Sequence, residues 1–293
     1  MSGMKSIFTP SSMLVPFHRL PSGYARSLRL APSGPATPRP AATLALLRMA
    51  ERGMEVLLLQ RSHRTRFIPG AYVFPGGRVD QKDAAPDLFE RLDGPSLEAA
   101  DARLDIRGTF PPGLAFWVAA LRETFEETGV LLASGSAGYR FAPQDEKNDL
   151  GRLRGALHRG AIDFRTVVDT VGSKLAGTKI SYIGHWVTPV QERQRYDARF
   201  FAAELPGSCP VFPDGEEMLK AIWMTPSQAL SLNREGSLPM VFPTLVTLEA
   251  LMTFETPADA LRELGEREVP RLLPQVEESG SGVLFTPRIA PPA

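Results

Sequence analysis

Residues 122–130 read Arg-Glu-Thr-Phe-Glu-Glu-Thr-Gly-Val and form the most informative stretch of the chain. If this stretch is helical, Glu123, Glu126 and Glu127 share one face, because residues three and four apart are neighbours on a helix surface. Gly129 suits the position just past the helix end, where the backbone turns left-handed. The three carboxylates then lie near the negative end of the helix dipole, which repels them.

A hard divalent cation would remove this electrostatic conflict. Mg²⁺ takes a few carboxylate oxygens and fills its remaining positions with water and substrate phosphate. For the helix taken alone, the alternative is a solvated acidic face in which Arg122 pairs with Glu126 one turn later. The sequence upstream of the helix favours the metal site.

The upstream segment begins Leu57-Leu58-Leu59-Gln60-Arg61-Ser62, continues through Arg66 and Gly70, and ends Phe74-Pro75-Gly76-Gly77. Together with the acidic helix it resembles the Nudix hydrolase superfamily, whose box is written G-x5-E-x7-R-E-U-x-E-E-x-G-U. Gly77 matches the first glycine, and residues 122–130 match the second half. The upstream segment also resembles the coenzyme A diphosphatase branch, whose pattern is L-L-T-x-R-[SA]-x3-R-x3-G-x3-F-P-G-G. Leu59, where the pattern has Thr, is the single departure.

The box itself is interrupted. Gly77 and Arg122 are 45 positions apart, whereas the family pattern separates them by 14. Counting back from Arg122, the first box glutamate falls on Leu114, so we expect that carboxylate to be missing, with Glu90 or Glu98 as possible substitutes. An interrupted box resembles the peroxisomal coenzyme A diphosphatases of animals and their bacterial relatives.

The extra chain, about residues 80–114, is expected to be a partly helical insertion. At the rim of the site it could act as a lid or as a wall for an acyl group. Alternatively, its apolar residues could simply pack on the domain. These residues are Leu88, Phe89, Leu92, Leu97, Leu104 and Phe110.

The Nudix resemblance implies roles for the acidic residues and the glycine loop. Glu126 and Glu127 are the expected ligands of Mg²⁺ or Mn²⁺, and the Gly77 carbonyl is an additional donor. Glu123 is expected to be a further ligand or a general base. Arg122 is expected to orient a neighbouring carboxylate through its two-toothed guanidinium group.

The coenzyme A pattern implies a substrate site. Arg61 and Arg66 are expected to bind phosphate, because guanidinium groups make bidentate, charge-assisted hydrogen bonds to phosphate oxygens. The alternative for each is a surface arginine. The backbone of Gly76 and Gly77 is expected to approach the substrate closely.

A general base could also come from a distant loop. Relatives in this family use such a carboxylate, and the loop before the last predicted sheet strand offers three acidic residues. A solvated loop is the alternative interpretation of these residues. They are Asp214, Glu216 and Glu217.

Three functions are compatible with the motifs. The first is a metal-dependent diphosphatase that converts coenzyme A or acyl-coenzyme A to 3′,5′-ADP and 4′-phosphopantetheine or its acyl form. The second is a Nudix hydrolase for another nucleoside diphosphate derivative, such as ADP-ribose or a dinucleotide. The third is a non-catalytic module that senses a nucleotide, for which the missing first glutamate is the best argument.

Composition indicates a globular protein without nucleic-acid or membrane partners. The 293 residues are 43% hydrophobic and 23% charged, and 33 basic residues balance 33 acidic ones. The single cysteine, Cys209, suits a reducing compartment, and no apolar run approaches the roughly 20 residues that span a bilayer. We expect a cytoplasmic, bacterial protein whose partner is a small-molecule substrate, and a homodimer is possible.

The chain divides into three regions. Residues 1–40 contain no Asp or Glu and many Pro, Ser and Gly, so we expect a flexible arm, with a mitochondrial targeting segment as the alternative. Residues 41–272 are expected to form one Nudix hydrolase domain. Residues 273–293 are expected to be a Pro/Gly-rich tail.

The pattern of apolar residues predicts an α/β fold, in which a mixed β-sheet lies in an α/β/α sandwich of the Nudix type with helical insertions and C-terminal helices. Residues 42–48 and 55–60 are expected to form a hairpin. Further strands are expected at 180–187, 199–203 and 221–224, and helices at 115–128, 145–158, 163–172, 226–230, 241–254 and 257–264. Trp117, Trp186 and Trp223 are expected in the core or in a pocket wall.

Overall fold

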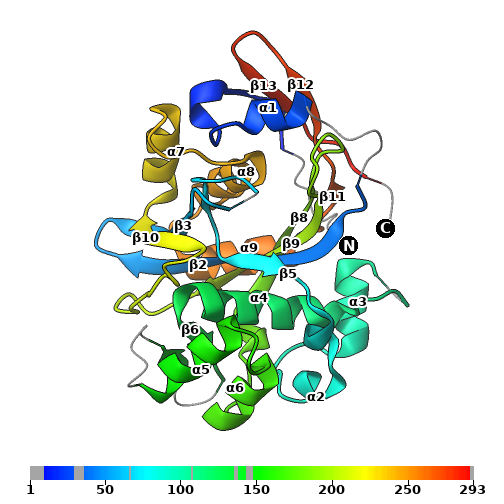
Figure 1. Cartoon of the computed structure of the whole chain (residues 1–293), viewed down its shortest axis with the longest axis vertical. Coiled ribbons are helices and arrows are strands. Elements are labelled where there is room, and N and C mark those ends of the chain that lie inside the picture. The colour runs from blue at the N-terminus through cyan, green and yellow to red at the C-terminus, as the bar shows by residue number, and fades with distance from the viewer. Residues whose placement is uncertain are drawn as a thin grey trace, which may run out of the picture.

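The computed structural model of the chain describes residues 10–29, 36–65, 67–106, 108–134, 138–142 and 148–290. A mixed sheet of eight strands crosses the molecule, and other elements cover both of its faces (Figure 1). Its strands are β2 (Arg39–Ala50), β3 (Gly53–Arg61), β4 (Tyr72–Val73), β5 (Gly76–Arg78), β8 (Ile180–Val187), β9 (Tyr196–Glu204), β10 (Met218–Met224) and β11 (Arg271–Leu272). The strand order is β10-β3-β2-β9-β8-β11, with β4 added to β3 and β5 added to β2.

The predicted hairpin of β2 and β3 is confirmed and forms the centre of the sheet. The chain turns at Gly53, whose φ is +105°, a conformation that favours glycine. On its other side β2 pairs in parallel with β9, from Arg39 opposite Tyr196 to Leu47 opposite Glu204. Parallel pairing requires a long connection, and the segment between these two strands supplies most of the helices that cover one face.

The central strands are buried on both faces. Leu44, Leu46, Leu57 and Leu59 belong to the core on one face, and Ala45, Leu47, Val56 and Leu58 belong to the core on the other. Because side chains alternate along a strand, continuous apolar runs of this kind produce a sheet covered on both sides. The predicted α/β sandwich is therefore confirmed.

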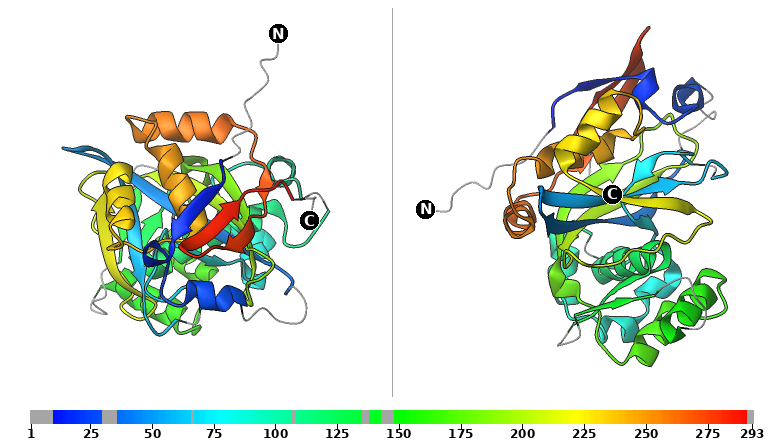
Figure 2. Two further views of the ribbon diagram at one scale, coloured as in Figure 1. Left: turned by 90° about the horizontal axis from the view of Figure 1, so that it is seen from above. Right: turned by 90° about the vertical axis from the view of Figure 1, so that its left-hand side faces the viewer.

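One face is covered by helices from the middle of the chain (Figures 1 and 2). They are α2 (Pro86–Phe89), α3 (Leu97–Leu104), α4 (Gly113–Thr128), α5 (Asp149–His158) and α6 (Phe164–Val171), beside the small hairpin β6 (Val130–Leu132) and β7 (Tyr139–Phe141). Helix α4 is the longest of these and is buried along most of its length. It carries the acidic residues, so the packing of α4 on the sheet positions the site.

The opposite face is covered by elements from the two ends of the described chain (Figure 2). They are β1 (Met13–Pro16), α1 (Tyr24–Arg29), α7 (Pro226–Arg234), α8 (Phe242–Leu251), α9 (Pro257–Glu266), β12 (Gln275–Glu278) and β13 (Gly282–Thr286). Helix α7 begins after Thr225, whose side chain accepts the Gln228 N–H in a capping box, as the sequence predicts. Within the described residues, no helix has both the length and the apolar character needed to cross a membrane.

The ends of the chain differ from the expected arm and tail. β1 pairs with β13, with Val15 opposite Val283, and β13 pairs in turn with β12. Val15, Val283 and Phe285 are buried, and the Phe285 ring stacks on Phe242 of α8. Frequent Pro, Gly and Ser obscure this short alternation of apolar residues in the sequence. The strands at the two ends fold because their apolar side chains are buried against the apolar surface of α8. Residues 1–9, 30–35 and 291–293 lie outside the described part.

The insertion packs on the domain and does not cover the site. Leu88, Leu92, Leu104 and Ile106 join the buried core around α4. The alternative of packing on the domain is therefore confirmed for Leu88, Leu92 and Leu104, and none of the six apolar residues lines the described cavity. Phe110, by contrast, is 70% exposed.

A buried ionic cluster ties β8, β9 and β11 together. The Asp197 carboxylate forms ion pairs with Arg199 Nη1 at 3.0 Å and Arg271 Nη2 at 3.2 Å. His185 Nε2 lies 2.5 Å from the same carboxylate. Burial lowers the pKa of His185 to about 4, so the imidazole is neutral near pH 7. The Arg199 guanidinium also lies over the ring of Phe116, 4.5 Å from its centroid. The cluster thus connects the sheet to α4.

We predict that Asp197→Asn destabilises the protein by roughly 3–5 kcal/mol, because it leaves the Arg199 guanidinium buried without its carboxylate. Urea unfolding followed by circular dichroism measures the loss. The matched control is Asp149→Asn, whose side chain is 85% exposed and should cost no more than about 0.5 kcal/mol. A loss below about 1 kcal/mol for Asp197→Asn would contradict a structural role for the cluster.

Candidate active site

A cavity of about 530 Å³ brings the predicted motifs together. Its lining includes the residues expected from the Nudix box and the coenzyme A pattern, apart from Arg66, which lies outside the described residues. The predicted residues in the lining are Arg61, Gly76, Gly77, Arg122, Glu123, Glu126 and Glu127. Segments far apart in sequence therefore meet at one site.

The acidic residues lie in the last two turns of α4. The helix ends at Gly129, whose φ is +73° and whose N–H bonds to the Phe125 carbonyl, as the sequence predicts. Glu127 is 5% exposed, and the side chains of Glu123 and Glu126 are 16% and 18% exposed. Burial of three carboxylates on one helix face is electrostatically costly unless cations compensate it.

Arg122 supplies part of this compensation and is itself held firmly. Its Nε and Nη2 donate to the Asp83 carboxylate at 2.7 and 2.9 Å, and Nη2 also donates to the Arg78 carbonyl at 2.9 Å. Its Nη1 lies 2.9 Å from Glu123 Oε1 and 3.3 Å from Glu126 Oε1. Arg122 therefore orients both carboxylates, in the role that the resemblance implies.

Asp83 corrects our expectation that the first box carboxylate is missing. Counted forward from Gly77, the G-x5-E spacing ends on Asp83, which is buried and pairs with Arg122. Counting back from Arg122 pointed to Leu114, which is a core residue. The insertion thus follows Asp83, and the first half of the box is intact with Asp in place of Glu. The forward count would have found this residue in the sequence.

Neither proposed substitute from the insertion reaches the site. Glu90 and Glu98 are exposed, and both are outside the described lining of the cavity. Asp83 instead lies just before the insertion, in a capping box in which it receives the Asp80 N–H at 2.7 Å. This cap fixes the backbone that carries the Asp83 carboxylate to Arg122.

The glycine loop lies directly against the acidic face. The Gly76 N–H donates to Glu127 Oε2 at 2.9 Å. A Cβ atom at Gly77 would lie 2.5 Å from the Glu123 carboxyl, and one at Gly76 would lie 2.4 Å from the Ala42 carbonyl oxygen. Glycine is therefore required at position 76, where the β2 backbone is in the way, whereas a side chain at position 77 would displace the Glu123 carboxyl.

The acidic cluster has perturbed proton affinities. Burial raises the pKa of Glu123 to about 7, assisted by the nearby Glu126 carboxylate and opposed by Arg122. Burial and the Glu123 carboxylate raise the pKa of Glu127 well above its ordinary value. Burial also raises the pKa of Glu126. The metal-free site therefore does not stabilise three ionised carboxylates together, and these glutamates retain their protons more readily than exposed ones.

The donor set fits a hard divalent cation in charge and chemistry. Among the described residues, no three acidic, histidine or cysteine side chains already converge as an ion site. Arg122 pairs with Glu123 and Glu126, and Gly76 holds one oxygen of Glu127. Carboxylate oxygens are nevertheless the ligands that Mg²⁺ and Mn²⁺ prefer, and a cation would relieve the repulsion between the ionised side chains.

The candidate base loop supplies one residue to the cavity. Asp214 accepts the N–H groups of Glu216 and Glu217 at 2.6 Å each, which stabilises the turn. Glu216 pairs with His158 at 3.2 Å. Glu217 alone of the three acidic residues lines the cavity.

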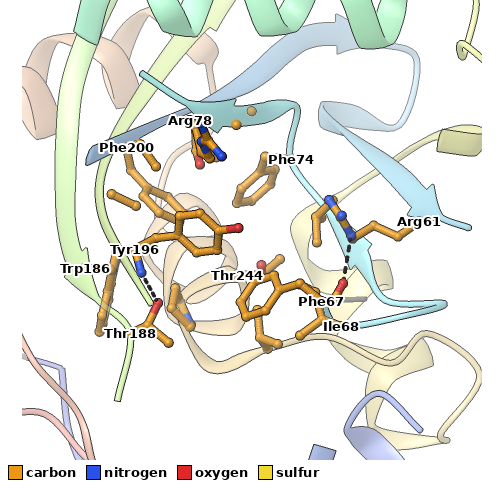
Figure 3. Close-up of a pocket in the computed structure, with 18 of the residues that line it drawn as sticks. Arg61, Phe67, Ile68, Phe74, Arg78, Trp186, Thr188, Tyr196, Phe200 and Thr244 are labelled. Atoms are coloured by element: carbon orange, nitrogen blue, oxygen red, sulfur yellow. Dashed lines mark hydrogen bonds between the residues drawn. The ribbon is translucent and has the colours of Figure 1, made fainter. Parts of the chain in front are cut away.

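Substrate-facing residues include one that the motifs missed. Arg61 lines the cavity, and its Nε donates to the Phe67 carbonyl at 3.2 Å. Arg78, which follows Gly77 in β5, lines the same cavity and is exposed. Its position next to the glycine loop could have suggested it. The remaining wall is aromatic (Figure 3), and no local motif in the sequence indicates it.

Comparisons with known proteins agree with this geometry. The family model described as the NUDT19 Nudix domain matches residues 25–251. Human acyl-coenzyme A diphosphatase NUDT19 is 29% identical over 270 residues, covering 82% of this chain and 68% of the human protein. The Xenopus laevis protein of the same name is 26% identical over 269 residues, covering 79% and 69%. The crystal structure of a Nudix hydrolase from Alicyclobacillus acidocaldarius has a TM-score of 0.62 at 30% identity, covering 78% of this chain and 96% of that one.

We predict that Gly77→Ala lowers kcat/KM for diphosphate hydrolysis by at least about tenfold, because the new Cβ displaces the Glu123 carboxyl. The melting temperature should change little, because Glu123 faces the cavity rather than the core. Gly280→Ala is the control, since a Cβ there meets no atom within 4 Å. Equal activity of the two variants would rule out a tight requirement at Gly77.

The raised pKa of Glu123 predicts a pH-dependent stability of the metal-free protein. The folded state binds the proton more tightly than the unfolded state, whose carboxyl titrates near 4.5, so the stability from this group is full below pH 4.5 and falls towards pH 7. Glu123→Gln cannot ionise and should therefore gain stability relative to wild type over this range, by up to about 3 kcal/mol. Urea unfolding in EDTA at pH 4.5 and 7.5 measures this difference. A pH-independent difference would refute the assignment.

Proposed function

The chain belongs to the Nudix hydrolase family, and we propose that it hydrolyses the diphosphate of coenzyme A or acyl-coenzyme A with Mg²⁺ or Mn²⁺. Water adds to one phosphorus atom, one P–O bond of the diphosphate bridge breaks, and the products are 3′,5′-ADP and 4′-phosphopantetheine or its acyl form. The observation that carries this proposal is the single cavity that joins Arg61, the glycine loop and the acidic face of α4. The acyl-coenzyme A diphosphatases among the relatives support it.

In this proposal Glu123, Glu126, Glu127 and the Gly77 carbonyl hold the cation. The ion supplies positive charge that offsets the charge of the diphosphate and polarises the bond to be broken. Arg122 keeps two of these carboxylates in position, and Asp83 keeps Arg122 in position. The alternative role for Glu123 is that of a general base that does not hold the cation, since burial in the metal-free site raises its pKa to about 7.

The arginines of the cavity bind the phosphates. Arg61 and Arg78 come from β3 and β5, on either side of the glycine loop, and both line the cavity. Guanidinium groups pair with phosphate oxygens in bidentate fashion, which orients the diphosphate as well as attracting it. Arg66 is proposed as a third phosphate contact from the coenzyme A pattern.

Asp83 weakens the case for a non-catalytic sensor. The best argument for a sensor was a missing first carboxylate in the box, and Asp83 fills that role by pairing with Arg122. All three acidic residues of the second half also line the cavity. The complete set favours a working hydrolase.

The test is hydrolysis of a panel of diphosphate compounds. With Mg²⁺ or Mn²⁺ present, free coenzyme A or an acyl-coenzyme A should yield 3′,5′-ADP by chromatography, and EDTA should stop the reaction. Glu127→Gln should lower the rate by at least about a hundredfold, because it removes one charge of the proposed cation site while keeping its shape. Faster turnover of ADP-ribose or a dinucleotide than of every coenzyme A species would instead assign the site to another substrate.

The control variant is Glu277→Gln, an exposed residue on β12 away from the cavity. It should retain the wild-type rate. Melting temperatures of both variants in EDTA separate a loss of chemistry from a loss of folding.

A further inference from the structure

The cavity continues past the glycine loop into an aromatic chamber. Trp186 of β8 and Phe242 of α8 contact edge to face, with centroids 5.6 Å apart at 84°. Phe242 in turn stacks on Phe285 of β13 at 4.9 Å and 6°. All three side chains are at least 95% buried and line the cavity. One wall of the chamber is thus rigid and apolar.

The rest of the chamber is formed by β9, beside Trp186, and by the segment that follows β3, which carries Phe67 and Ile68 across from Trp186 (Figure 3). Phe74 lies edge to face with Phe200 at 6.4 Å, and Phe67 lies edge to face with Tyr196 at 5.2 Å. Ile68, next to Phe67, has a φ of +43°, a strained conformation for a β-branched residue. Such strain persists where the surrounding structure holds a functional segment in place.

Charge divides the cavity into two parts. The arginines in its described lining are Arg61, Arg78 and Arg122, and Arg61 marks the boundary between the two parts, because its Nε donates to the Phe67 carbonyl. Beyond Arg61, the described lining of the aromatic part holds no cation, and its carboxyl group is that of Glu192, which is 5% exposed beside Tyr24. A phosphate would bind poorly in this part, because a buried anion needs a positive partner.

We propose that the aromatic chamber takes the uncharged arm of the substrate, namely pantetheine and the acyl group attached to it. This inference rests on the proposed function and deepens it. The arm carries amides, a hydroxyl group and a thioester but no charge, whereas the 3′,5′-ADP half carries a phosphate that must stay near the arginines. Each methylene of an acyl chain buried in the chamber would add up to roughly fourfold in affinity.

Thr244 makes the chamber testable. It lies in the first turn of α8, it is 3% exposed, and its side chain faces the cavity together with Phe67 and Ile68 (Figure 3). Thr244→Phe would fill this end of the chamber without changing any charge. The matched control is Thr253→Phe, which makes the same substitution at an exposed position just past α8.

The experiment measures kcat/KM for octanoyl-coenzyme A and inhibition by each product half, 4′-phosphopantetheine and 3′,5′-ADP. In Thr244→Phe we expect kcat/KM for octanoyl-coenzyme A and the affinity for 4′-phosphopantetheine to fall at least about tenfold. The inhibition constant of 3′,5′-ADP should stay within about twofold, because the arginine part is unchanged. Thr253→Phe should match wild type in all three measurements.

Other outcomes overturn the inference. Weaker 3′,5′-ADP binding with unchanged 4′-phosphopantetheine binding would place the adenosine half in the chamber, and unchanged values for both halves would exclude the chamber from substrate binding. If Thr244→Phe does not fold, Ala198→Leu fills the chamber from β9 and repeats the test. Wild-type protein that cleaves no coenzyme A species would refute the proposed function itself, which the variants alone cannot do.

Discussion

The ion pair between Asp83 and Arg122 is the constraint on which the rest of the site depends. Arg122 also bonds the Arg78 carbonyl and lies against Glu123 and Glu126, so one guanidinium joins β5, the start of the insertion and α4. The carboxylates on α4 would otherwise repel one another in a buried setting. Because this pair is sheltered from water, breaking it would leave an uncompensated charge beside the acidic face.

The sheet separates chemistry from recognition. On one face, α4 presents carboxylates whose charge suits a cation and a diphosphate. On the other face, α8 and β13 present aromatic rings that suit an uncharged group. One cavity is lined by both parts, because its lining includes Gly76, Gly77 and Glu127 as well as Phe242 and Phe285. This continuity allows one substrate to contact residues on both faces of the sheet.

Local features of the site could be predicted from the sequence, whereas its walls could not. The acidic face and Gly129 follow from the spacing along one helix, and the sheet follows from continuous apolar runs such as those of β2 and β3. Asp83 could have been predicted in the same way, because its spacing from Gly77 matches the first half of the box. The aromatic chamber was not, because Trp186, Phe242 and Phe285 come from three distant segments and meet only through tertiary packing. For the same reason the folded ends looked like an arm and a tail.

The pairing of β1 with β13 has a consequence for the order in which the protein matures. Val15 lies opposite Val283, so β1 has no strand partner until β13 has been synthesised, on the order of tens of seconds after β1 itself. The α4 face can be assembled from the middle of the chain well before then. A nascent chain would therefore possess its carboxylates before it possesses Phe285 and the wall around it. The aromatic wall would therefore form only after the acidic face that it adjoins.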